Sequence, residues 1–316
     1  MSKIVLLESL GVDEGLLEEL EAPFVAEGHT FVSFDKSVDP DVLVRELEGA
    51  EVAIIANMPF GDDVIRRADN LRFVDVAFTG VDHVGLTACR EKGVKVSNAS
   101  GYSNEAVAEL VLGMMLAIAR NMRAVEDRAR EHGCKDGLVG TELCNKVVGI
   151  VGLGRIGSRT ASLCHAFGCR VITHNRTYHK DAPAYVEQVD MDRLLAESDY
   201  VILHCPLTDE TQGMIARAEL HKMKKTAVLI NVARGGVVKT QDLCEALHEG
   251  VIAYAGIDVF DVEPPLGEDE PLLHCANCLI TPHVAFATQE SMAMRARIVF
   301  DNLRAWLDGK QKNIIL

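Results

Sequence analysis

The chain has 316 residues, which predicts about two domains, each large enough to bury its own core. Hydrophobic residues make up 48% of the chain and charged residues 25%, an ordinary balance for a globular protein, and no apolar run is long enough to span a membrane. The net charge of −15, without any basic stripe, excludes nucleic acid and anionic membrane as expected partners.

The beginning of the chain and its cysteines indicate a cytoplasmic location. The start MSKIVLLES has one lysine before a strand-like run and no small-residue cleavage site, so we expect no signal peptide. The nine cysteines are scattered and odd in number, which favours reduced thiols. Cys275 and Cys278 form one C-x-x-C beside His274, but no second pair completes a four-ligand site, so we expect no metal.

Residues 3–98 alternate apolar runs with helix-compatible stretches, which predicts a parallel sheet in an open α/β unit. This unit has no phosphate-binding glycine fingerprint, so we expect it to bind a ligand other than a nucleotide cofactor. Strands are expected at Lys3–Leu7, Phe31–Phe34, Val52–Ala56, Phe73–Ala77 and Val94–Asn98. Helices are expected near Glu14–Glu27, Pro40–Glu48, Asp62–Ala68 and Leu86–Glu91.

The next long element is expected to be a buried helix at Ser103–Arg120, with Ser103 as a possible N-cap and a wide apolar face. Because it follows the first sheet, we expect it to bridge the two domains. Residues 121–143 are polar and contain Gly137 and Gly140, so they are expected to form an exposed arm or a partner-facing segment.

The central motif is the stretch KVVGIVGLGRIGSR at residues 146–159. A strand-like run, Val147–Val151, leads into a glycine turn and then into a helix-compatible segment. In such a turn Gly152 allows the tight bend, Gly154 lets the backbone approach a pyrophosphate, and Gly157 lets helix and strand pack closely. The helix N-terminus then offers N–H groups and a positive dipole end to the phosphates, so the stretch predicts a dinucleotide site.

After this motif the alternation of strands and helices resumes, and six strands around a dinucleotide turn predict a Rossmann domain. A last amphipathic helix, Thr288–Leu307, is expected to return and pack on the first domain. The strands are expected at Val147–Val151, Arg170–His174, Tyr200–Leu203, Ala227–Val232, Ala253–Asp258 and Cys278–Thr281. The helices are expected at Ile156–Phe167, Met191–Glu197, Arg217–Lys222 and Gln241–Gly250.

The end of the second strand of this domain indicates which cofactor is used. An acidic residue there would hydrogen-bond the ribose 2′-hydroxyl of NAD and repel the 2′-phosphate of NADP. Here Asn175 is neutral, Arg176 follows it, and Lys180 is close behind. Because a guanidinium binds phosphate bidentately, the sequence favours NADP(H) over NAD(H). The alternative is that Arg176 is a solvated loop charge and the cofactor choice is loose.

Three later segments place Arg234, Glu263 and His283 just beyond the carboxyl ends of strands, where open α/β sheets bind ligands. Such a set suits reduction of a 2-oxo acid. The arginine pairs with the substrate carboxylate and polarises the carbonyl, the histidine donates the proton, and the glutamate orients the imidazole and favours its protonated form. Any one of these residues alone is more often structural than catalytic: His283 is then a satisfied buried histidine, and Glu263, which precedes Pro264, a turn residue.

The chain resembles the D-2-hydroxyacid dehydrogenases over nearly its whole length, in particular the glyoxylate and hydroxypyruvate reductase branch. The resemblance rests on the motifs FTGVDHV (78–84), NASGYSNEAVAE (98–109), VGLGRIG (151–157), LHCPLT (203–208), INVARGG (230–236), DVFDVEPP (258–265) and TPHVA (281–285). It implies two doubly wound parallel-sheet domains with the active site in the cleft. A flavodoxin-like substrate domain would comprise 1–99 and 287–316, and a Rossmann NAD(P)-binding domain 100–286.

The resemblance also implies the site residues and a homodimer built around the nucleotide domains, with the Ser103 helix and the following arm at the interface. The catalytic set is Arg234, Glu263 and His283. The cofactor-binding residues are Gly152, Gly154, Arg155, Ile156, Gly157, Asn175, Arg176, Thr177, Cys205, Pro206, Thr208, Val232, Ala233, Asp258 (on the nicotinamide carboxamide) and His283. The resemblance places the substrate carboxylate on the backbone of Thr79, Gly80 and Val81 and on Arg234. Contacts to the rest of the substrate are expected, from loop positions at the carboxyl ends of strands or next to the catalytic set, at Asn57, Met58, Pro59, His83, Tyr102 and Phe286.

We therefore expect an oxidoreductase that transfers hydride between NAD(P)H and a small 2-oxo acid to give an (R)-2-hydroxy acid. One alternative is oxidation of formate or phosphite on the same fold, which the Glu263–His283 pair disfavours because formate releases no hydroxyl proton. The other is a non-catalytic dinucleotide-sensing corepressor, which we would expect to carry extended interaction tails that the printed sequence lacks. The sequence leaves the particular oxo acid open.

Overall fold

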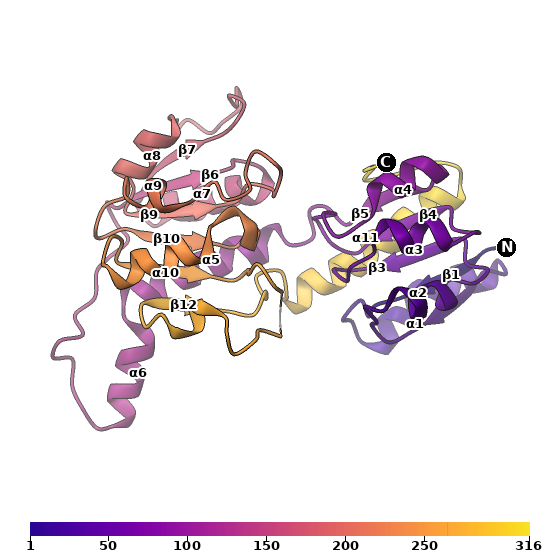
Figure 1. Cartoon of the computed structure of the whole chain (residues 1–316), viewed down its shortest axis with the longest axis horizontal. Coiled ribbons are helices and arrows are strands. Elements are labelled where there is room, and N and C mark those ends of the chain that lie inside the picture. Colours follow the sequence, from indigo (N-terminus) through magenta and orange to yellow (C-terminus); the bar gives the residue numbers. More distant parts are fainter. Residues whose placement is uncertain (264) are drawn as a thin grey trace. The chain divides into compact units, whose positions relative to one another are not determined.

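The computed structural model describes residues 1–263 and 265–316, and these divide into two compact units (Figure 1). The N-terminal unit comprises Met1–Ser103 and Ala287–Leu316, and the central unit comprises Asn104–Phe286. Among the described residues, no helix combines the length and apolar character that crossing a membrane requires.

The N-terminal unit is a five-stranded parallel sheet in the order β2-β1-β3-β4-β5. Every residue of β3 and β4 is buried, because helices cover both faces of the sheet, as parallel sheets require. Its strands are β1 (Lys3–Leu6), β2 (Thr30–Ser33), β3 (Val52–Ile55), β4 (Phe73–Val76) and β5 (Lys95–Asn98). Its helices are α1 (Glu14–Ala26), α2 (Pro40–Glu46), α3 (Asp62–Arg67), α4 (Leu86–Lys92) and α11 (Gln289–Leu307).

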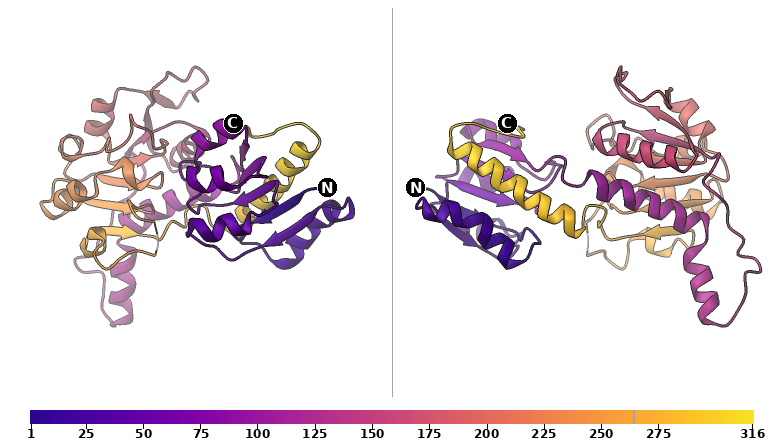
Figure 2. Two further views of the ribbon diagram at one scale, coloured as in Figure 1. Left: turned by 45° about the vertical axis from the view of Figure 1, so that its right-hand side comes forward. Right: turned by 180° about the vertical axis from the view of Figure 1, so that it is seen from behind.

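The last helix, α11, belongs to the N-terminal unit although it follows the central unit in the chain, as expected (Figure 2). It begins at a capping box in which Thr288 and Ser291 bond each other's backbone N–H groups. Its Trp306 stacks on Phe73 of β4, with ring centroids 5.2 Å apart. Buried Asn302 donates to the Asp75 carboxyl at 3.0 Å, so polar as well as apolar contacts fasten this helix to the sheet.

The central unit is a seven-stranded parallel sheet in the order β12-β11-β10-β9-β6-β7-β8. Its strands are β6 (Val147–Val151), β7 (Arg170–His174), β8 (Val186–Gln188), β9 (Tyr200–Leu203), β10 (Val228–Asn231), β11 (Tyr254–Ile257) and β12 (Cys278–Ile280). Its helices are α5 (Asn104–Ala119), α6 (Met122–Arg130), α7 (Arg155–Ala166), α8 (Met191–Glu197), α9 (Arg217–Leu220) and α10 (Thr240–His248), with 3₁₀ turns at Gly235–Val237 and Pro271–His274.

Two elements of the central unit differ from the sequence-based expectation. The expected count of six strands was wrong, because β8 adds a seventh at the edge beside β7. Only one of the three β8 residues is buried, so an apolar run could not reveal the strand. The segment 121–143, expected from its polar composition to be an exposed arm, contains helix α6, none of whose residues is buried.

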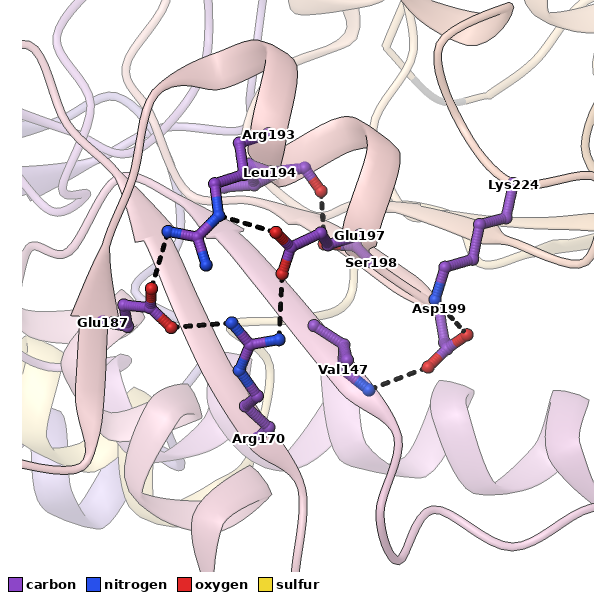
Figure 3. Close-up of polar contacts among 9 residues, drawn as sticks. All are labelled: Val147, Arg170, Glu187, Arg193, Leu194, Glu197, Ser198, Asp199 and Lys224. Carbon is purple, nitrogen blue, oxygen red and sulfur yellow. Dashed lines mark hydrogen bonds and ion pairs between the residues drawn. The ribbon is translucent and has the colours of Figure 1, made fainter.

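Two arginines and two glutamates form a ring of ion pairs near the amino-terminal end of β7 and beside β8 (Figure 3). Arg170 binds Glu187 at 2.7 Å and Glu197 at 2.9 Å, and Arg193 binds both carboxylates at 2.6 Å. The four side chains are 34–46% exposed. The ring stabilises the fold at the end of the sheet opposite the one where parallel strands bind ligands.

Candidate active site

The glycine turn after β6 has the geometry that a pyrophosphate requires. Gly152 has φ +100°, and a Cβ on Gly157 would lie 2.0 Å from the Gly152 carbonyl oxygen, so both positions need glycine. Around Gly154, the N-cap of α7, a Cβ would have no atom within 4 Å in the described part of the chain. Because no side chain there caps the helix, its first N–H groups are available to phosphate oxygens, and the turn fits a dinucleotide.

The end of β7, beside the glycine turn, carries an amide and a cation. The Asn175 Oδ1 accepts a hydrogen bond from the Leu153 N–H at 2.5 Å and so holds the glycine turn. Arg176 is exposed and pairs with Glu210 at 3.0 Å, and Thr177 beside it is exposed as well. The strand end therefore presents a guanidinium, and not a carboxylate of its own, to a ligand.

Cys205, Pro206 and Thr208 lie in the loop after β9, and residue 204 of this loop contacts α7. His204 makes the link, with Nε2 2.9 Å from Thr160 Oγ1 on that helix. Burial lowers the pKa of His204 to about 4, so this imidazole stays neutral. Its hydrogen bond joins the loop to α7. Burial raises the pKa of the Cys205 thiol to about 11, so it remains protonated. The sequence did not single out His204, because its role depends on contact with a helix 44 positions away.

The turn after β10 presents Val232, Ala233 and Arg234, and buried Asn231 holds its shape. The Asn231 Nδ2 donates to the Arg234 carbonyl at 2.9 Å, and its Oδ1 accepts from the Ala233 N–H at 3.1 Å. A Cβ on Gly235 would lie 2.0 Å from the Phe260 carbonyl carbon. Glycine is therefore required for this turn to lie against the segment that leads to Glu263.

The structure brings His283 and Glu263 together, with His283 Nδ1 2.5 Å from Glu263 Oε2. The histidine side chain is 12% exposed and the glutamate 44% exposed. His283 has φ +54°, a left-handed conformation that a bulky residue adopts at an energetic cost, and its ring lies edge-on to Phe286. The Glu263 carboxylate therefore occupies the Nδ1 side of the ring.

Asp258 holds the loop that carries His283. Its buried carboxylate accepts from Thr281 Oγ1 at 2.6 Å and from the N–H groups of Val284 and Ala285, both at 2.9 Å. Burial raises the pKa of Asp258 more than these bonds lower it. The resemblance predicted a contact with the nicotinamide carboxamide, whereas the contacts in the structure are to the loop. A cofactor contact would have to use a remaining lone pair.

The predicted substrate residues of the N-terminal unit all follow the carboxyl ends of β3, β4 and β5. The Thr79 carbonyl accepts from Asn98 Nδ2 at 2.7 Å, which shapes the loop with Gly80 and Val81. The Thr79 hydroxyl is buried without a partner among the described residues, and Asn57 is half-buried.

Tyr102 and Met58 are more enclosed than the other predicted substrate residues. Tyr102 is 4% exposed and lies between Phe78 and the guanidinium of Arg295. Met58 is fully buried, so its side chain belongs to the core of the unit in this structure. His83 is half-buried and Pro59 is exposed.

A dinucleotide turn, a paired histidine and glutamate, and an arginine on the neighbouring strand end define a nicotinamide-dependent oxidoreductase. The family model of the D-isomer specific 2-hydroxyacid dehydrogenase NAD-binding domain matches residues 112–285, more than half of the chain. The chain belongs to this family, and the formate or phosphite and corepressor alternatives are not favoured.

Individual relatives match from about four fifths of the chain to nearly all of it. The glycerate dehydrogenase of Methylorubrum extorquens is 32% identical over 99% of this chain and 98% of its own. The glyoxylate/hydroxypyruvate reductase B of Pectobacterium carotovorum is 39% identical over 79% of this chain and 80% of its own. The solved D-lactate dehydrogenase of Aquifex aeolicus, complexed with NAD and lactic acid, has a TM-score of 0.87 at 27% identity and covers 97% of this chain and 96% of its own.

Proposed function

We propose that this protein reduces glyoxylate or hydroxypyruvate to the (R)-2-hydroxy acid with NADPH. The observation that carries the proposal is the His283–Glu263 pair, 2.5 Å apart, on a loop held by Asp258. The substrate class also follows the names of the two relatives compared above. The bound dihydronicotinamide supplies hydride to the carbonyl carbon of the substrate.

The protein's own residues handle the substrate's charge and proton. Arg234 pairs with the substrate carboxylate and stabilises negative charge as it grows on the carbonyl oxygen. His283 donates the proton to that oxygen from Nε2, and Glu263 orients the ring and stabilises its cationic form. The backbone N–H groups of residues 79–81 receive the carboxylate. In this scheme residues 1–99 and 287–316 form the substrate domain, and 100–286 the cofactor domain.

The preference for NADPH rests on the end of β7. Asn175 carries no charge that would repel a 2′-phosphate, and the exposed Arg176 guanidinium is free to rotate from its surface pair with Glu210. A phosphate carries about −1.5 to −2 charges and outcompetes one carboxylate for the same fork of donors. NADPH binding therefore replaces the Arg176–Glu210 pair.

We also propose a homodimer formed by the central units. Helix α6 has no buried residue and projects from the sheet (Figure 1). At its base lies a hollow of about 440 Å³, lined by residues that include Ile118, Met122, Tyr254 and Leu279. A second copy would cover this surface, and light scattering on the purified protein tests it.

The protein belongs, in this proposal, to the cytoplasm, because its nine cysteines are free thiols and the cytoplasm keeps thiols reduced.

The experiment that tests the reaction follows nicotinamide absorbance with NADPH and NADH in parallel, against glyoxylate, hydroxypyruvate and pyruvate. We expect oxidation of NADPH well above NADH with the first two acids. Turnover with NADH alone would keep the reaction and contradict the assignment of Arg176. Absence of turnover with every acid and both cofactors, in protein shown to bind NADPH, would overturn the proposed function.

A further inference from the structure

The N-terminal sheet reverses its strand order at β1 and β3. The chain places β2 on one side of β1 and then β3, β4 and β5 on the other, so the loops after β1 and β3 leave in different directions. Open α/β sheets bind ligands in the crevice at such a switch point, outside the carboxyl ends of the strands. The loop after β1 carries Glu8, and the loop after β3 carries residues 56–58.

A side chain of the protein itself fills the anion site at this point. One carboxylate oxygen of Glu8, Oε2, accepts the N–H groups of Ala56 at 3.0 Å, Asn57 at 2.9 Å and Met58 at 3.0 Å. Three successive N–H groups converging on one oxygen form a concavity that binds anions. Because Glu8 is 8% exposed and already occupies it, a substrate anion does not enter this concavity.

Lys36, from the loop after β2, neutralises this carboxylate and orients the asparagine. Its Nζ lies 2.9 Å from Glu8 Oε1 and donates to Asn57 Oδ1 at 3.2 Å. Since the amide oxygen of Asn57 is used in this way, its Nδ2 group points elsewhere, and it donates to no residue in the described part of the chain. Half-buried Asn57 therefore presents hydrogen-bond donors at the switch point.

We propose that Glu8 and Lys36 are positioning residues that hold Asn57 so that its Nδ2 group recognises an oxygen on C3 of the substrate. This rests on the proposed function, because it names which substituent the 2-oxo acid reductase selects. Hydroxypyruvate has a C3 hydroxyl that accepts this bond, whereas pyruvate has only a methyl group in its place. Such a site disfavours pyruvate, because its methyl group takes the place of the hydroxyl and leaves the donors unpaired.

The positioning role is tested first without turnover, by amide hydrogen exchange in Glu8→Gln. A neutral amide accepts weaker hydrogen bonds than a carboxylate, so exchange at residues 56–58 should speed up by about tenfold. The matched control is Glu91→Gln, which removes an exposed partner of Arg66 2.9 Å away in the same unit. Equal protection of these amides in Glu8→Gln and wild type would overturn the role of Glu8.

The selectivity is tested by comparing kcat/KM for hydroxypyruvate and pyruvate. We expect the ratio to fall by about tenfold in Glu8→Gln and in Lys36→Met, with KM for NADPH and the ratio in Glu91→Gln unchanged. Lys36 is 48% exposed, so its variant should fold even if Glu8→Gln does not. An unchanged ratio in folded Lys36→Met contradicts the inference. If wild type reduces no 2-oxo acid, the proposed function fails, while the exchange experiment still decides the role of Glu8.

Discussion

Nδ1 of His283 and Oε2 of Glu263 lie 2.5 Å apart, although the two residues are 20 positions apart in the chain. The contact depends on two supports. Asp258 accepts from the N–H groups of the two residues after the histidine, and His283 itself has a left-handed backbone conformation. In the proposed mechanism the carboxylate holds Nδ1, and the proton is transferred from Nε2.

Replacing Glu263 should slow the chemical step more than it weakens binding. We expect Glu263→Gln to lower kcat by about 10- to 100-fold with little change in KM for NADPH, because the amide positions the ring but no longer stabilises its charge. Steady-state kinetics measure this. Glu268→Gln, in the same segment, serves as the control and should keep wild-type kcat.

Arg234 should not tolerate replacement by another cation. Lysine is a point charge and cannot form the two parallel hydrogen bonds that guanidinium makes with a carboxylate. We expect Arg234→Lys to lose about 2 kcal/mol or more of transition-state stabilisation in kcat/KM, and Arg234→Ala to lose still more. An Arg234→Ala enzyme that kept most of its turnover would contradict the proposed mechanism.

The Arg176–Glu210 pair should respond in opposite directions when each partner is changed. Arg176→Ala should raise KM for NADPH by about tenfold and leave KM for NADH unchanged, because only NADPH carries the 2′-phosphate. Glu210→Gln should lower KM for NADPH, since it removes the competing carboxylate 3.0 Å from the guanidinium. Parallel titrations with both cofactors measure these effects, and equal changes for NADH and NADPH would contradict the phosphate contact.

Asp75 should make the stability of the protein depend on pH. Burial raises the pKa of this carboxyl well above its usual range, more than the hydrogen bond from Asn302 lowers it. Its Oδ2 has no partner among the described residues. The folded state therefore retains a proton that the unfolded chain releases. This contribution to stability is complete below the unfolded pKa of about 3.9 and is lost as pH rises through the folded value.

An Asp75→Asn variant should remove that dependence, since an amide resembles the protonated acid and keeps the acceptor that Asn302 uses. We expect the Tm of the variant to exceed that of wild type increasingly from mildly acidic to alkaline pH. Thermal unfolding across this range measures it. A constant difference in Tm at every pH would show that Asp75 does not titrate with folding.

The sequence by itself determined the two α/β halves, most strand positions and the glycine turn. These depend on local signals: buried parallel strands are continuous apolar runs, and Gly152 and Gly157 are required by the backbone of their own turn. Arg234, Glu263 and His283 were predicted by their places after strands and by motif. What escaped prediction was short or lay in a polar segment, as in the three-residue edge strand β8 and helix α6, which has no buried residue.

Only the tertiary structure decided how the site is supported. The Glu8 carboxylate accepts hydrogen bonds from amides 48 to 50 positions away. The Asp258 carboxylate accepts hydrogen bonds from N–H groups of the loop that carries His283. Met58, expected at the substrate, lies fully in the core. A sequence records which groups follow a strand, but the direction of each side chain depends on the strands and helices that the fold places beside it. Those neighbours are distant in the chain, and only the packed sheet brings them within hydrogen-bond distance.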